Sequence, residues 1–341
     1  MGLGLKRIDE QVMVITGASS GIGLATAILA ANRGARVVLN SRDEQDLAGA
    51  VERIRADGGQ AIHHVGDVAD PEAMRGLADR ALSEFGRIDT WVNNAGVSVY
   101  GRIEEVSLED ARRLFETNYW GVVNGTLAAL PRLRLEGGAL INIGSILSST
   151  GYPLQGHYTA SKHAVKGFTD SLRIELEEAG VPVSVTLIQP AAIDTPYPQH
   201  AKSYLGVEPK HLPPVYAPEV VADAIVQCAQ QPQRDVLVGG SGKVFAATEK
   251  YAPRLGDLMK EKTGFAGQYT DLPDRGEDTL HAPRPGDGRV HGDYPGRVLQ
   301  SSLYTKARLN RGATLLSLAV IGAGIALASR PSRSGGNGER F

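Results

Sequence analysis

The stretch VMVITGASSGIG, residues 12–23, decides the fold. It opens with a short β-branched apolar run and passes through three glycines, Gly17, Gly21 and Gly23, into an amphipathic run that extends to Arg33. A glycine-rich turn between a strand and a helix lets the backbone approach a pyrophosphate, and the free N–H groups and helix dipole stabilise that anion. The spacing is not G-x-G-x-x-G, and glycines also end strands for structural reasons, so the turn alone is a weak signal.

Outward from this stretch, short apolar runs alternate with longer amphipathic ones. The expected strands are 12–16, 36–39, 61–65, 88–93, 139–143, 183–188 and 235–238, and the expected helices are 21–33, 42–57, 71–85, 108–130, 158–179 and 218–230. Most strand-like runs are continuously apolar, as in strands covered on both faces, and repeated β–α alternation predicts a parallel sheet. We therefore expect one doubly wound α/β domain of Rossmann type over residues 8–262, with about seven strands.

The C-terminal part of the sequence has a different composition. Residues 263–304 are crowded with Gly, Pro and charged side chains and show no periodicity, which predicts an extended or disordered linker. Residues 313–329 carry no charge and have basic flanks. As a helix they would measure about 25 Å, slightly short of a ~30 Å hydrocarbon core. We expect a membrane helix at 313–329 within a tail of 305–341; the alternatives are a buried core helix and an oligomerisation helix packed on protein.

Composition excludes several classes of function. The 341 residues include 36 basic and 38 acidic side chains, a balance that gives no reason to expect a nucleic-acid partner. Cys228 is the one cysteine, so neither an intrachain disulfide nor a cysteine-based metal site can form, and no His or carboxylate cluster has metal-ligand spacing. Residues 1–10 contain no apolar run long enough for a signal peptide, so we expect catalysis in the cytoplasm.

The end of the second expected strand bears on cofactor choice. A site specific for NAD normally presents an acidic side chain there to the ribose 2′-hydroxyl. This chain has the neutral Asn40, followed by Ser41 and Arg42. An arginine fork suits a 2′-phosphate, because its hydrogen bonds are bidentate and charge-assisted. The pattern favours NADP(H) over NAD(H); the alternative for Arg42 is a surface position near the next helix.

Tyr158 and Lys162 stand four residues apart in a helical run, so both project from the same face. A free tyrosine has a pKa near 10, too high for proton exchange at neutral pH. An ammonium about 4 Å away, at an effective dielectric constant of about 20, contributes ~4 kcal/mol, or about three pKa units. The pair therefore predicts general acid–base chemistry, although this spacing also occurs by chance on solvated helix faces.

With these residues in view, the chain resembles the classical short-chain dehydrogenase/reductase family over about residues 12–240. The motifs that carry the resemblance are Thr-Gly-x-x-x-Gly-x-Gly at 16–23, Asp67-Val68 after the third strand, Asn93-Asn94-Ala95-Gly96 at the end of the fourth, Asn118 in a helix, Ser145 after the fifth strand, and Tyr158-x-x-x-Lys162. A serine hydrolase is excluded as the reading of Ser145, because GSILS lacks the second glycine of a nucleophile elbow.

The resemblance implies a role for each catalytic residue. Tyr158 would give a proton to the carbonyl oxygen in reduction, or take it in oxidation, and Ser145 would hydrogen-bond that oxygen. Lys162 would bind the nicotinamide ribose and lower the pKa of Tyr158, while Asn118 would hold a water in a proton relay. The family also usually forms dimers or tetramers, which implies a homo-oligomer.

The resemblance likewise implies a cofactor site. Asp67 would contact the adenine and Thr195 the carboxamide. The full expected set is Thr16, Gly17, Ser19, Ser20, Gly21, Ile22, Gly23, Ser41, Arg42, Asp67, Val68, Asn94, Ala95, Gly96, Tyr158, Lys162, Pro190, Ile193 and Thr195. The sequence departs from the family's Pro-Gly at Pro190-Ala191, where alanine fits only if its φ is negative.

We therefore expect an NADP(H)-dependent oxidoreductase that reduces a carbonyl or oxidises an alcohol. Tyr197 and Tyr204, in a Pro-rich loop at 191–217, predict an apolar small-molecule substrate. The alternative is a membrane-associated, nucleotide-binding regulator with a vestigial reductase site, which has no need of the Tyr158–Lys162 pair.

Overall fold

The computed structural model describes residues 4–240, 248–249 and 251–309. In this part of the chain seven strands form one parallel sheet in the order β12-β7-β6-β4-β1-β2-β3. The strands are β1 (Val12–Thr16), β2 (Arg36–Ser41), β3 (Gln60–Val65), β4 (Thr90–Asn93), β6 (Gly138–Ile143), β7 (Val183–Pro190) and β12 (Asp235–Val238). The chain starts in the middle, builds outward to β3 and then crosses back to build the other half. The predicted doubly wound Rossmann-type sheet is confirmed.

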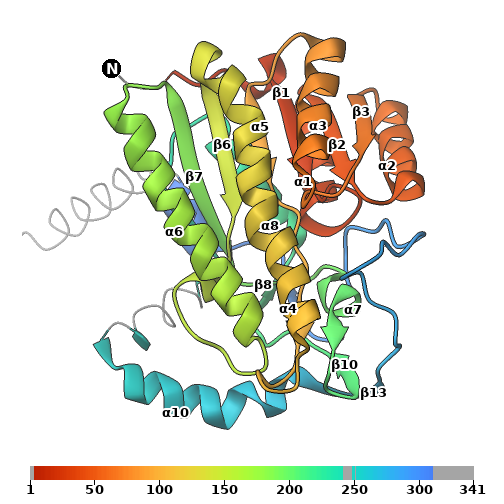
Figure 1. The fold of residues 1–341 in the computed structure, drawn as a ribbon, viewed down its shortest axis with the longest axis vertical. Coiled ribbons are helices and arrows are strands. Elements are labelled where there is room, and N and C mark those ends of the chain that lie inside the picture. Colours follow the sequence, from red (N-terminus) through yellow and green to blue (C-terminus); the bar gives the residue numbers. More distant parts are fainter. Residues whose placement is uncertain (1–3, 241–247, 250, 310–341) are drawn as a thin grey trace, which may run out of the picture.

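Helices cover both faces of the sheet (Figure 1). They are α1 (Gly21–Asn32), α2 (Glu44–Ala56), α3 (Pro71–Phe85), α4 (Leu108–Phe115), α5 (Gly121–Glu136), α6 (Gly156–Glu178) and α8 (Pro218–Cys228). Alternate residues of β1 point to opposite faces: Met13 and Ile15 pack with α1, α2 and α8, whereas Val12 and Val14 pack with α3, α5 and α6. All four side chains are fully buried, which explains the unbroken apolar run in the sequence.

The helix expected over 108–130 is interrupted. A π-helical turn, η2 (Glu116–Trp120), separates α4 from α5, and α5 continues to Glu136. The turn directs Asn118 inward, where its amide bonds both backbone groups of Val97. A π-turn of this kind often marks a functional position, and the hydrophobic period does not reveal it.

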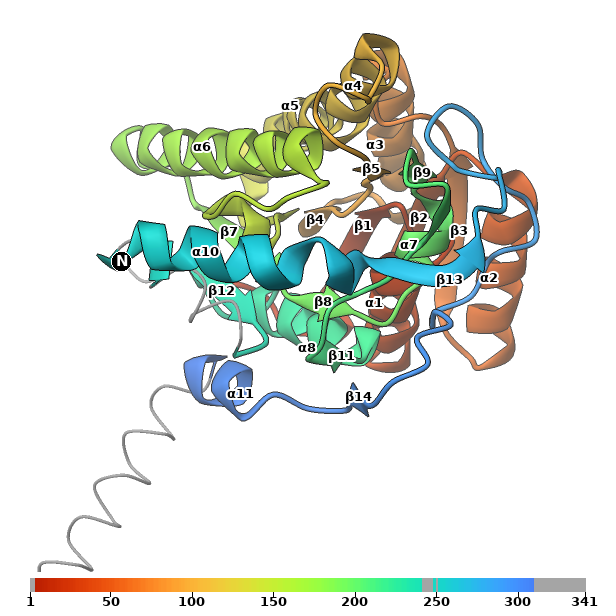
Figure 2. The same ribbon diagram turned by 90° about the horizontal axis from the view of Figure 1, so that it is seen from below.

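Short elements gather at the carboxyl ends of the sheet strands, seen from below in Figure 2. They are β5 (Val99–Tyr100), η3 (Ile146–Ser148), β8 (Ala192–Ile193), α7 (Tyr197–His200), β9 (Lys202–Ser203), β10 (Val207–Pro209), β11 (Val215–Tyr216), α10 (Pro253–Gly264), η4 (Ala266–Gln268), β13 (Tyr269–Pro273) and β14 (Val298–Leu299). The remaining short helices are η1 (Ile8–Glu10) and α11 (Leu303–Leu309). This edge is where ligands of open α/β sheets bind.

Residues 263–304 differ from the extended or disordered linker that their composition predicts. They begin at the end of α10, continue as β13, which pairs antiparallel with β10, and later form β14 beside β11. Between β13 and β14 the backbone is irregular but packed, and Leu280 is fully buried. The backbone groups of this segment form hydrogen bonds with other parts of the domain instead of within one regular element. Its sequence therefore shows no helix or strand periodicity.

The expected membrane helix at 313–329 lies outside the described residues. Among the helices that the structure describes, none is long and apolar enough to cross a membrane.

Candidate active site

The glycine turn lies between β1 and the first residue of α1. Gly17 has φ of +63°, and a Cβ on Gly23 would lie 2.1 Å from the carbonyl oxygen of Gly17. Asn94, at the end of β4, donates to the carbonyl oxygens of Thr16 and Gly17 at 2.9 and 3.0 Å. The hydroxyl of Thr16 in turn accepts from the backbone N–H groups of Asn94 and Ala95. These hydrogen bonds between the ends of β1 and β4 therefore fix the conformation of the turn, and the N-terminus of α1 lies next to it.

The four expected catalytic residues come together at the same edge of the sheet. Lys162 on α6 donates to the carbonyl oxygen of Ile143, the last residue of β6, at 2.9 Å. Its Nζ lies 5.7 Å from the ring centroid of Tyr158, one turn earlier on α6. Ser145 follows β6 by two residues and caps η3. Asn118 is fully buried and also donates to Ser161, the neighbour of Lys162, at 3.1 Å.

Burial is the largest cause of the pKa shifts of Tyr158 and Lys162. It raises the pKa of Tyr158, while the nearby hydroxyls of Tyr197 and Ser145 act in the opposite direction. It also lowers the pKa of Lys162 to about 8. The expected lowering of the Tyr158 pKa by Lys162 is therefore not found: the ammonium is directed to Ile143, and desolvation of the phenolate outweighs it.

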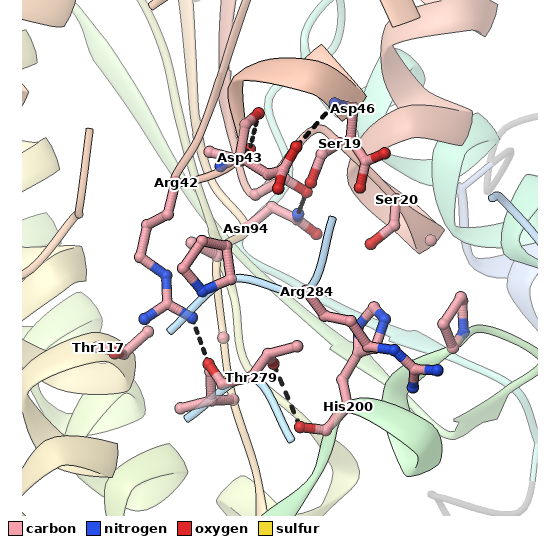
Figure 3. A pocket seen from close by; sticks show the side chains of 18 of the residues that line it. Ser19, Ser20, Arg42, Asp43, Asp46, Asn94, Thr117, His200, Thr279 and Arg284 are labelled. Carbon is pink, nitrogen blue, oxygen red and sulfur yellow. Dashed lines mark hydrogen bonds between the residues drawn. The ribbon is translucent and has the colours of Figure 1, made fainter. Parts of the chain in front are cut away.

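A cavity of about 210 Å³ adjoins the glycine turn (Figure 3). Most of the expected cofactor residues line it, namely Gly17, Ser19, Ser20, Gly21, Ile22, Ser41, Arg42, Asp67, Val68, Asn94, Ala95, Gly96 and Thr195. Thr16 and Gly23 lie behind the turn instead of on the cavity wall, and Pro190, Ile193, Tyr158 and Lys162 line a neighbouring cavity. The glycines form a cradle that a Cβ would fill, and this cradle fits the diphosphate of a dinucleotide.

The adenosine end of this cavity contains contacts that sequence reasoning missed. Asp67, expected to contact the adenine, is paired with Arg113 of α4. Arg42, expected to bind a 2′-phosphate, donates to the backbone carbonyls of Thr279 and Leu280. Asn40 donates to the carbonyl oxygens of His64 and Gly66, so its amide donors are used inside the fold. Nothing in the sequence pattern connects these distant positions.

The second cavity, of about 390 Å³, contains Tyr158 and Lys162 and shares Ile22, Asn94, Gly96, Thr195 and Tyr197 with the first. Its wall is mostly apolar and aromatic, including Leu147, Tyr152, Tyr100, Tyr197 and Leu212. Tyr100 and His211 are wall residues that the sequence analysis did not single out. A group bound in this cavity would lie beside Tyr158 and Lys162.

The loop over this cavity separates the two tyrosines expected to contact substrate. The ring of Tyr197 lies 5.7 Å from that of Tyr158, between centroids, and stacks on His211 at 5.9 Å. Tyr204 does not line the cavity; its hydroxyl donates to Asp110 at 2.5 Å. Ala191 stands where the family has glycine, and this substitution requires a negative φ. The structure meets that requirement, because Leu154 is the one non-glycine residue with positive φ in the described ranges.

The described residues contain no group of three His, Cys, Asp or Glu side chains that could hold a metal ion.

His211 makes the stability of the fold depend on pH. Burial lowers its pKa from the usual 6.5 to about 4. Between these values the unfolded chain binds a proton that the folded chain does not, so stability falls as the pH falls from about 6.5 to 4. Phenylalanine does not titrate, so we expect His211→Phe to lose up to ~3 kcal/mol less free energy of unfolding than the wild type when the pH falls to 4.

Thermal unfolding of both proteins across this pH range measures the effect, with His291→Phe as the matched change at an exposed position. Parallel stability curves for the wild type and His211→Phe would contradict the assignment.

Comparison with known proteins agrees with this geometry. The family model described as "short chain dehydrogenase" matches residues 11–204. The chain is 43% identical over 309 residues to the uncharacterized oxidoreductase YxnA of Bacillus subtilis, covering 89% of this chain and 87% of that protein. A short-chain dehydrogenase/reductase from Burkholderia phymatum, solved in complex with NAD, is 28% identical with a TM-score of 0.67, covering 74% of this chain and 96% of that one. An alcohol dehydrogenase from Thermococcus sibiricus, solved with 5-hydroxy-NADP, is 27% identical with a TM-score of 0.59. The match covers 67% of this chain and 95% of that one.

Proposed function

Because this chain belongs to the short-chain dehydrogenase/reductase family and is an oxidoreductase of that family, we propose that it is NADP(H)-dependent and interconverts an apolar carbonyl compound and its alcohol, with Tyr158 as the proton donor or acceptor. The observation that carries the proposal is the junction of the two cavities. The glycine turn opens into one, Tyr158 and Lys162 line the other, and both cavities share Asn94, Gly96 and Thr195.

The nicotinamide ring, when bound, supplies a hydride to the carbonyl carbon or accepts one from the alcohol carbon. The protein must then deliver a proton to the carbonyl oxygen. Tyr158 is placed for this step because its protonated phenol lines the second cavity beside Lys162. Ser145 would donate a hydrogen bond to the same oxygen and hold it within reach of the phenol.

Lys162 offsets the charge that remains when Tyr158 has lost its proton. Its ammonium lies 5.7 Å from the centroid of the Tyr158 ring, so Coulomb attraction would stabilise the phenolate. The hydrogen bond to Ile143 fixes the ammonium at this distance, since the carbonyl belongs to the end of β6. Asn118 would act as a positioning residue, because it joins η2 to Ser161 and Val97 beside Lys162.

The preference for NADP(H) rests on Arg42. It lines the adenosine end of the first cavity next to Ser41, and the side chain at position 40 is neutral. The guanidinium of Arg42 contacts the backbone carbonyls of Thr279, Leu280 and His281 and lies 4.0 Å from Asp67. Because a guanidinium has five N–H donors, a 2′-phosphate would use those that remain. The filled catalytic positions argue against a regulator with a vestigial site.

Two further expectations rest on the sequence and on family membership. A homo-oligomer is the usual state of the family, and size-exclusion chromatography tests it.

The tail at 313–329 is proposed as a membrane anchor because of its uncharged composition and basic flanks. We expect full-length protein to require detergent for extraction from membranes, and protein lacking residues after 305 not to; extraction of the full chain without detergent would contradict the anchor.

Tyr158→Phe tests the proposed chemistry. The change removes the transferable proton and leaves the ring in place, so we expect NADPH oxidation on any accepted carbonyl to fall by ~10²–10⁴-fold while NADPH binding persists. The assay uses carbonyl compounds graded from small and polar to long and apolar. An unchanged rate in the variant would exclude Tyr158 as the acid.

Tyr197→Ser tests the substrate class. Loss of an aromatic wall worth about 1.5–3 kcal/mol should raise KM for long apolar carbonyls by about 10- to 100-fold and change small polar ones little. Tyr204→Ser is the matched control, because that side chain lies outside the cavity. Equal effects of Tyr197→Ser on small and large carbonyls would argue against an apolar substrate.

A further inference from the structure

Residues 278–292, here called the C-terminal strap, cross the mouth of the first cavity. At one end Thr279 and Leu280 accept hydrogen bonds from Arg42. At the other end the carbonyl oxygen of Arg289 accepts from the backbone N–H of Gly21, at the start of α1, at 2.9 Å. In Figure 1 the strap is the blue segment beside α7. It therefore spans the cavity from the adenosine end to the glycine turn.

The strap packs firmly against the domain through a buried side chain and two ion pairs. Leu280 is fully buried in a cluster with Val97 and Leu114. Asp287 pairs with His200 of α7 at 2.8 Å, and Asp278 pairs with Lys202 at 3.2 Å. These contacts join the strap to the loop that also carries Tyr197.

Arg284 is the strap residue whose side chain fits a ligand. It lines the cavity together with Ser19, Ser20 and Gly21, and Figure 3 shows its guanidinium projecting into the space on the His200 side. Its Nη2 contacts Glu277 at 3.0 Å, a carboxylate that is 62% exposed. Its Nη1 is buried and has no hydrogen-bond partner. A buried guanidinium nitrogen without a partner can donate a hydrogen bond to a ligand oxygen as its acceptor.

The carboxylates that line the same cavity are already engaged. Asp287 binds His200 and Arg289, Asp67 binds Arg113, and Asp46 accepts from the backbone of Gly286. Asp43 caps α2 through the backbone N–H of Asp46. None of these four carboxylates is paired with Nη1 of Arg284, which leaves that nitrogen open to an acceptor on a bound ligand.

We propose that Arg284 binds the diphosphate of the nicotinamide cofactor, opposite the glycine turn, so that the strap forms a second wall of the cofactor site. The inference rests on the proposed function. The diphosphate is favoured over the 2′-phosphate because Arg284 lies between strap positions 279–280 at Arg42 and position 289 at Gly21, and its guanidinium is directed away from Arg42 in Figure 3. An arginine fork there would add a charged donor to the backbone N–H groups of the turn other than those of Ala18 and Gly21, which already donate to Asn40 and Arg289.

Binding of NADPH and NADH to full-length protein, followed by nucleotide fluorescence, tests the proposal without turnover. Arg284→Met should raise the Kd of both nucleotides by about tenfold or more, and by the same factor, because both contain the diphosphate. Arg284→Lys should lie between, since it keeps the charge and loses the fork. Arg297→Met, an exposed arginine outside the cavity, is the control for the loss of one positive charge.

Unchanged Kd values in Arg284→Met, in protein that unfolds at the wild-type temperature, would overturn the proposal. A rise confined to NADPH would also overturn it and assign Arg284 to the 2′-phosphate instead. If the wild type binds neither nucleotide, the proposed function fails first, so the two failures are distinguishable.

Discussion

The close approach of α1 to the end of β1 is the constraint on which the rest of the site depends. A Cβ on Gly23 would lie 2.1 Å from the carbonyl oxygen of Gly17, so only glycine allows the helix to begin there. Asn94 then fastens the turn to β4 through two backbone carbonyls. Because β1 and β4 are neighbours at the point where the sheet reverses its direction of growth, this junction opens the cavity that runs across the sheet edge.

The residues proposed for catalysis depend on the same edge of the sheet. In a parallel sheet the carboxyl ends of neighbouring strands lie together, so the end of β6 supplies both Ser145 and the carbonyl oxygen that holds Lys162. The π-turn places Asn118 beside this position from a third element. Desolvation there raises the pKa of Tyr158 and lowers that of Lys162 to about 8.

The substrate loop and the C-terminal strap act as one cover over this edge. His200 and Lys202 of the loop pair with Asp287 and Asp278 of the strap. The loop presents Tyr197 and His211 to the second cavity, while the strap presents Arg284 to the first. The walls of the two cavities are thus joined by these two ion pairs.

The sequence by itself determined the sheet, its helices and the residues that meet at its edge. Continuous apolar runs, a glycine turn and the Tyr158–Lys162 spacing are local patterns, and strand-end motifs converge in any parallel sheet. Only the tertiary structure decided what Arg42 and Asp67 contact, where Tyr204 points, and that residues 278–292 wall the cofactor cavity. Those outcomes depend on irregular segments that bond to distant backbone groups, and such bonds have no periodicity from which a sequence pattern could be recognised.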